Sequence, residues 1–155
     1  NFKVNATGTT TTVIDADVAV TSGSYYTVMA TGLLAGIQPL VLTDDLTNPA
    51  AGNVKVRLVH GAPSAPNVDI YVTAPGADIS MTAPTLTDVP FRGYSDYLEV
   101  PAGSYQVRIT PTGTKTVALD TGTLAVTAGQ IRTGVALDAT GGGTPFGAIV
   151  LADEN

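Results

Sequence analysis

Short runs of alternating apolar and polar residues recur along the chain. Residues 54–58 read Val-Lys-Val-Arg-Leu, residues 68–72 read Val-Asp-Ile-Tyr-Val, and Tyr105, Val107 and Ile109 alternate with polar neighbours. A period of two places successive side chains on opposite faces of a β-strand. The pattern therefore predicts strands over these three segments.

The remaining apolar runs are also short, and turns rich in Gly and Pro separate them. Further strands are predicted at residues 97–100, 116–119, 124–126, 131–137 and 148–152. Turn signals every 8–12 residues or so are typical of an antiparallel sandwich or barrel. Only residues 29–34 are compatible with a helix, and Thr31-Gly32 disfavours even this one. We predict an all-β protein.

An internal repeat organises the chain. Residues 2–9, Phe-Lys-Val-Asn-Ala-Thr-Gly-Thr, align with residues 107–114, Val-Arg-Ile-Thr-Pro-Thr-Gly-Thr. Residues 18–23 then align with 124–129, and residues 40–45 align with 149–154. Residues 53–105 have no counterpart upstream. The chain is therefore interpreted as the second half of one repeat followed by a complete repeat.

This interpretation predicts the domain boundaries. Residues 1–47 are the C-terminal half of a first β repeat, and residues 54–155 are a complete β-sandwich repeat. Residues 48–53 are a short Pro/Ala/Gly linker between them.

Composition narrows the classes of function. Seven basic and 13 acidic residues give a formal net charge of −6, which argues against a nucleic-acid partner. The absence of cysteine excludes disulfide frameworks, zinc–thiolate sites and thiol catalysis. No apolar run is long enough to span a membrane, and no signal-peptide pattern opens the sequence. The acidic, threonine-rich composition is that expected of a mature chain at an extracellular or cell-surface location.

His60 is the only histidine, and Ser64 and Asp69 follow it closely. A hydrolytic triad needs a nucleophile held by a base and an orienting acid, commonly on a Gly-x-Ser-x-Gly elbow. No such elbow occurs in the sequence. We interpret His60, Pro63 and Pro66 as a structural turn, in which the imidazole nitrogens bond to the Pro-rich loop. No catalytic residue and no enzymatic activity are expected.

The carboxylates at strand ends are the candidate metal ligands: Asp15, Asp17, Asp44 and Asp45. Calcium takes six to eight or so oxygen ligands around a defined loop, and no Asp-x-Asp-x-Asp-Gly loop is present. Solvated strand ends are the favoured interpretation, and a cation site that depends on an interface stays open. No cofactor is expected.

Exposed aromatic side chains would mark a glycan-binding face. Tyr25, Tyr26 and Tyr71 are the candidate glycan contacts, because adjacent or out-of-phase positions leave one ring exposed. Strand alternation instead places Tyr97 and Tyr105 in the core. Without tryptophan, packing of the tyrosines is favoured over a glycan platform.

Two segments carry a resemblance to a known family. Residues 56–72, Val-Arg-Leu-Val-His-Gly-Ala-Pro-Ser-Ala-Pro-Asn-Val-Asp-Ile-Tyr-Val, resemble the opening signature of domain-of-unknown-function family 4397. Residues 89–105, Val-Pro-Phe-Arg-Gly-Tyr-Ser-Asp-Tyr-Leu-Glu-Val-Pro-Ala-Gly-Ser-Tyr, resemble its second block. The resemblance implies secreted or surface-attached bacterial modules, often in tandem, with an immunoglobulin-like antiparallel β-sandwich and no established activity. The first copy, which lacks both blocks, is expected to be an incomplete module.

The half repeat suggests how the chain functions. About four strands at residues 1–45 would leave an apolar face and unpaired edges. The predicted assembly interface comprises Val4, Val18, Val20, Val28, Leu40 and Leu42. Three solutions are open: a fragment of a longer tandem protein, packing on the complete module, or strands from another subunit.

We therefore expect a non-enzymatic extracellular structural or adhesive protein that self-associates, as a homo-oligomer or filament, through β-strand complementation. The alternative is a glycan- or cation-binding module of a larger secreted surface protein, with surface glycans as partners.

Overall fold

The computed structural model describes residues 1–154 as an all-β protein, which confirms the predicted fold class. The chain divides into two compact units, one spanning Asn1–Leu46 and one beginning at Thr47. In the described part of the chain, no helix has the length and apolar character needed to cross a membrane.

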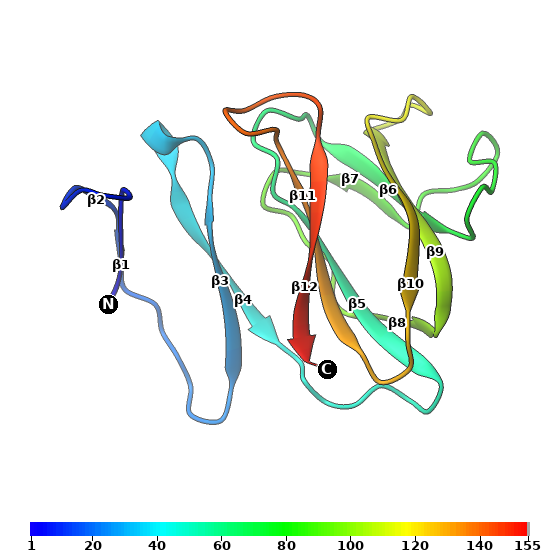
Figure 1. The fold of residues 1–155 in the computed structure, drawn as a ribbon, viewed down its shortest axis with the longest axis horizontal. Coiled ribbons are helices and arrows are strands. Elements are labelled where there is room, and N and C mark those ends of the chain that lie inside the picture. Colours follow the sequence, from blue (N-terminus) through cyan, green and yellow to red (C-terminus); the bar gives the residue numbers. More distant parts are fainter. Residues whose placement is uncertain (155) are drawn as a thin grey trace. The chain divides into compact units, whose positions relative to one another are not determined.

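The second unit is a complete β-sandwich of two four-stranded sheets (Figure 1). One sheet has the strand order β10-β9-β6-β7, and the other has the order β12-β11-β5-β8. The strands are β5 (Asn53–His60), β6 (Val68–Thr73), β7 (Leu86–Val89), β8 (Leu98–Pro101), β9 (Gly103–Pro111), β10 (Leu119–Val126), β11 (Ile131–Leu137) and β12 (Gly147–Glu154).

The core of this sandwich lies between the two sheets. Leu58 and Ala136 from one sheet pack with Val68, Ile70 and Ile109 from the other. All strand pairs in the two sheets are antiparallel except β5 with β11, which run parallel. The period-two pattern read from the sequence thus delivers apolar side chains from both sheets to one buried layer.

The first unit contains two hairpins. Strands β1 (Phe2–Asn5) and β2 (Thr12–Ala16) form one two-stranded sheet, and β3 (Tyr25–Thr31) and β4 (Gln38–Asp44) form the other. Residues 29–34, the one stretch compatible with a helix, lie in β3 and in the connection that follows it. The only helical turn between β3 and β4 is a 3₁₀ turn, Leu34–Gly36. The four strands expected in this half repeat are therefore present.

Two details of the predicted strands are wrong. Residues 116–118 lie in the connection before β10, which begins at Leu119, and Lys115 just before them donates from Nζ to the Tyr71 hydroxyl, 3.1 Å away. Strand β7 was not predicted, since its sequence Leu-Thr-Asp-Val is short and includes Asp88 in the left-handed region with φ of 53°.

The segment predicted as a linker is bound to the second unit. The amide of Ala50 donates to Glu99 Oε1 at 2.8 Å, and Asn53 Nδ2 donates to the same oxygen at 2.9 Å. Lys55 Nζ donates to the carbonyl of Thr47 at 2.8 Å. Asn53, the last residue of the predicted linker, is the first residue of β5.

Candidate assembly site

The first hairpin of the incomplete unit repeats a hairpin of the complete unit. Lys3 lies opposite Asp15 between β1 and β2, and Arg108 lies opposite Asp120 between β9 and β10. Both pairs occupy the same positions of the sequence repeat. In the first hairpin Lys3 Nζ is 3.0 Å from Asp15 Oδ2. The two copies therefore share their cross-strand register as well as their sequence.

The turns of these two hairpins are also the same. Gly8 has φ of +74° and Gly113 has φ of +75°, a region that favours glycine. In each turn the threonine after the glycine donates its amide to the carbonyl three residues earlier, at 3.0 Å in both copies. The alignment of residues 2–9 with 107–114 thus reflects one conserved local structure within the chain.

The second hairpin of the incomplete unit corresponds to β11 and β12. Thr27 on β3 donates from Oγ1 to Asp44 Oδ2 at 2.8 Å. At the equivalent positions, Thr133 on β11 donates from Oγ1 to Asp153 Oδ2 at 2.6 Å. Residues 1–46 therefore hold the same two hairpins that form the C-terminal half of the sandwich.

In the complete unit, the N-terminal half of the repeat adds two side chains to this Thr–Asp pair. Arg57 Nε on β5 donates to Thr133 Oγ1 at 3.1 Å, and Arg57 Nη2 lies 4.0 Å from Asp153 Oδ2. The Tyr97 hydroxyl donates to the same carboxylate oxygen at 2.8 Å. Burial, together with this hydrogen bond, raises the pKa of Tyr97. Arg57 and Asp153 form a buried ion pair across the sheet.

The N-terminal half also supplies the strands that continue each sheet. Strand β5 pairs in parallel with β11, and β6 pairs antiparallel with β9. Within residues 1–46, β1 pairs only with β2, and β3 pairs only with β4. Within residues 1–46, no strand pairs with the edge of β3 that corresponds to the β5–β11 pairing. None pairs with the edge of β1 that corresponds to the β6–β9 pairing.

The predicted interface residues differ in their exposure. Val20 is 69% exposed, and Val4, Val18, Val28 and Leu40 are half-buried or nearly so. Leu42 is fully buried in the middle of β4, so the expectation that it is available to a partner is wrong. The accessible part of the predicted interface excludes this residue.

His60 ends β5 and contacts the following loop. Its Nε2 lies 3.1 Å from the carbonyl of Pro66, and the amide of Ala62 points to Nδ1 at 3.4 Å. A neutral imidazole that donates from Nε2 and accepts at Nδ1 satisfies both contacts. Burial lowers the pKa of His60.

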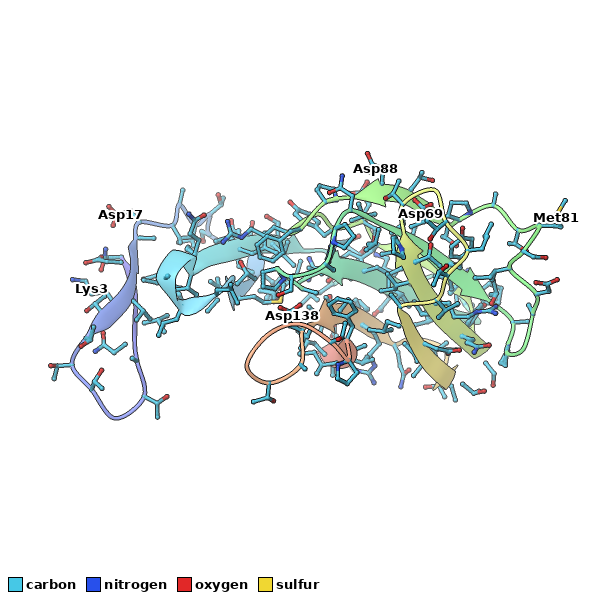
Figure 2. All side chains as sticks on the ribbon, turned by 90° about the horizontal axis from the view of Figure 1, so that it is seen from above. Lys3, Asp17, Asp69, Met81, Asp88 and Asp138 are labelled. Atoms are coloured by element: carbon cyan, nitrogen blue, oxygen red, sulfur yellow. The ribbon has the colours of Figure 1, made fainter. Side chains whose placement is uncertain are left out.

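The other two residues of the rejected triad have separate roles. Asp69 Oδ1 accepts the amide of Asp88 and Oδ2 accepts the amide of Gly113, both at 2.9 Å (Figure 2). The amide of Ser64 points to Asp138 Oδ1 at 3.4 Å. Asp69 is thus used to join β6 to two neighbouring segments.

The candidate metal ligands are held in local contacts. Asn1 Nδ2 donates to Asp15 Oδ1 at 2.9 Å and to Asp17 Oδ1 at 3.1 Å, and Lys3 Nζ lies 3.0 Å from Asp15 Oδ2. The hydrogen bond from Asn1, and then that from Lys3, lower the pKa of Asp15. Asp44 accepts from Thr27. Among the described residues, no group of three or more His, Asp or Glu side chains is placed to hold a metal ion.

The tyrosines are only partly as predicted. Tyr25 is 60% exposed, and the Tyr26 hydroxyl accepts the amide of Thr21 at 3.0 Å. Tyr71 is 1% exposed, so it is wrong as a glycan contact. Its ring lies on the face of β6 opposite that of the core residue Ile70, with Lys115 Nζ 4.6 Å from the ring centre. Tyr97 is half-buried through its bond to Asp153.

Sequence reasoning missed the Thr–Asp–Arg–Tyr cluster. Part of its signal was present, because the repeat alignment pairs residues 40–45 with 149–154 and so places Asp44 and Asp153 at equivalent positions. Alternation alone assigns Arg57 to a solvated face. Its burial depends on cross-strand partners 76 positions away in sequence, which a local pattern does not reveal.

Fold and site together define a protein of tandem all-β sandwich modules, the first of which is represented by its C-terminal hairpins. The chain belongs to the family described as Domain of unknown function (DUF4397), whose model matches residues 1–71 and 72–155. The boundary between these matched segments falls inside β6 rather than at the boundary of the structural units. No curated protein matches the sequence.

Proposed function

We propose that the protein is a non-enzymatic extracellular structural or adhesive protein that joins a surface assembly or filament by β-strand complementation. One observation carries this proposal. Residues 1–46 reproduce the two hairpins of the complete unit without the strands, β5 and β6, that extend both sheets there. Unpaired strand edges of this kind accept further strands.

The complete unit specifies the geometry of the completing strands. A strand like β5 would run parallel to β3, with its arginine opposite Thr27, as Arg57 lies opposite Thr133. A strand like β6 would run antiparallel to β1, as β6 does to β9. Each added strand would provide backbone hydrogen bonds to the edge, and the arginine would fix the register.

The number of halves limits the possible donors. The described residues hold two C-terminal halves, β1–β4 and β9–β12, and one N-terminal half, β5–β8. Each copy thus has one N-terminal half for two C-terminal halves. If identical copies exchanged their N-terminal halves, each copy would still contain one C-terminal half without completing strands. Complementation among identical copies therefore always leaves open strand edges, which favours an open array over a closed dimer.

A peptide that carries both completing strands tests the proposal on the whole chain. Residues 53–73 span β5 and β6, so this synthetic peptide can be titrated into isotope-labelled protein and followed by NMR. Saturable binding is expected, with amide shifts and slower hydrogen exchange along β1 and β3. Strands β9 and β11 already have these neighbours, and their amides should change little.

Two control peptides sharpen the test. A scrambled sequence should not bind, and an Arg57→Ala peptide should bind at least about tenfold more weakly, because it lacks the charge that sets the register. Absence of binding by the native peptide would overturn the proposal. A monodisperse monomer in light scattering at high protein concentration, with no effect of the peptide, would do the same.

A further inference from the structure

A largely apolar cavity of about 320 Å³ lies between the two sheets of the complete unit. Ile70, Ile109 and Leu119 form its buried wall. Ile149 and Val150 on the edge strand β12 line it too, and they are 46% and 55% exposed. The cavity therefore reaches from the core to the surface, where solutes can enter.

Small side chains on the lining strands explain why the space is unfilled. Gly134 and Ala136 on β11, Ala125 on β10 and Ala148 on β12 all line the cavity. The position of Gly134 is filled by Val28 in the equivalent strand β3, as the shared hairpin register shows. The complete unit thus lacks a side chain that the first copy has.

The backbone does not require a glycine at this position. Gly134 is not among the glycines with positive φ, and an added Cβ would lie 3.3 Å from Leu58 Cδ2, the flexible end of a side chain. A glycine inside a strand weakens the strand, and it often marks a place where a ligand approaches closely. Gly134 therefore contributes to the open space, and its position in the strand is compatible with close approach of a bound molecule.

The polar groups of the cavity belong to three lining residues. Thr121, Gln130 and Arg132 are half-buried, whereas most of the other lining residues are apolar. Arg132 lies two residues before Gly134 on β11, so both side-chain positions share one face of the strand. One positive charge at the edge of an apolar space suits an amphiphile with a negative head.

We propose that this cavity binds the hydrocarbon chain of a single-chain fatty carboxylate, with the carboxylate facing Arg132. A cavity of roughly 150 Å³ accommodates benzene, so the present volume fits a saturated chain of about 8 to 12 carbons. The volume also falls at the lower end of ordinary ligand pockets. A peptide strand is a poorer occupant, because its backbone polar groups would lack hydrogen-bond partners in the apolar interior.

The test is a titration of the isotope-labelled full chain with octanoate, decanoate and dodecanoate below their critical micelle concentrations. Saturable NMR shifts are expected at the cavity-lining residues, and affinity should rise about fourfold per added methylene until the cavity is filled. Gly134→Val fills the space and should weaken decanoate binding at least tenfold. Gly147→Val is the matched control, because Gly147 is a strand glycine outside the cavity lining.

Two further variants distinguish the contacts of the ligand's hydrocarbon chain from those of its carboxylate. Ala148→Leu narrows the exposed mouth and should weaken binding even if Gly134→Val fails to fold. Arg132→Gln should weaken decanoate binding while leaving the binding of decanol unchanged. Absence of saturable shifts at the lining, or decanoate affinity unchanged in both Gly134→Val and Ala148→Leu, would overturn the proposal. The strand-complementation function is not involved in either outcome.

Discussion

At the scale of single residues, buried polar groups join segments that are distant in sequence. Asp69 accepts backbone amides from Asp88 and Gly113, and Arg57 reaches across the sheet to Asp153. A buried charge that loses its partner costs several kcal/mol, so such groups disfavour misaligned strand pairings.

His60 makes the stability of the complete unit depend on pH. Burial lowers its pKa, while the carbonyl of Pro66 and the charge of Asp138 act in the opposite direction. The unfolded chain therefore binds more protons than the folded chain below about pH 6.5, the ordinary pKa of histidine. Stability is fully present above that pH and falls as pH decreases toward the folded pKa.

We expect the urea midpoint of the wild-type chain to fall between pH 7.5 and pH 5.5. His60→Gln should remove most of this slope, since the carboxylates with lowered pKa values titrate at more acidic pH. A wild-type midpoint that is flat or rises on acidification would contradict the assignment.

At the scale of secondary structure, the hairpin is the unit that the sequence repeats. The turn geometry and the cross-strand pairs of β1–β2 recur in β9–β10, and the Thr–Asp bond of β3–β4 recurs in β11–β12. These interactions are local, so each hairpin specifies its own register. Pairing between hairpins instead depends on β5 and β6.

The conserved turn can be tested by replacing its glycine. Gly113→Ala places a Cβ at φ of +75°, which should cost about 1–2 kcal/mol in the free energy of urea-induced unfolding. Gly103→Ala is the matched control, because Gly103 has no positive φ and no atom within 4 Å of the added Cβ. Equal stability of the two variants would show that the turn does not require glycine.

The same distinction between local and distant interactions explains what the sequence could predict. Alternation and turn residues located most strands, and the repeat identified β1–β4 as half a module. Strand β7 could not be predicted because Asp88 breaks the alternating pattern. The burial of Tyr71 and Leu42 could not be predicted because both depend on neighbours that are not adjacent in sequence. The cavity could not be predicted for a related reason. The space left by the missing side chain of Gly134 is apparent only when both sheets are in place.

At the scale of the whole molecule, one structural half occurs in two contexts. Strands β9–β12 are extended by β5 and β6, whereas β1–β4 form two-stranded sheets within their own unit. Isolated two-stranded hairpins are marginally stable in water. The two copies should therefore differ in stability despite their shared local structure.

Hydrogen exchange on the full chain can compare equivalent amides directly. We expect the amides of β11 to be protected at least about 100-fold more than those of β3, because opening β11 requires most of the sandwich to unfold. Val28 and Gly134 form a matched pair in the middle of these strands. Equal protection would mean that residues 1–46 are as stable as the complete unit.

The parallel pairing of β5 with β11 has a consequence for the order of folding. Arg57 and Thr133 are 76 positions apart in sequence, so this pairing closes a long loop, whereas each hairpin closes over a short turn. Hairpins form within about 1–10 μs, and non-local pairings that must first close a long loop form more slowly. We expect hairpins to form first and the β5–β11 pairing to complete the sandwich late. Residues 1–46 form only hairpins, which fold fast. We therefore expect their strand edges to be available to a partner before the complete unit has closed.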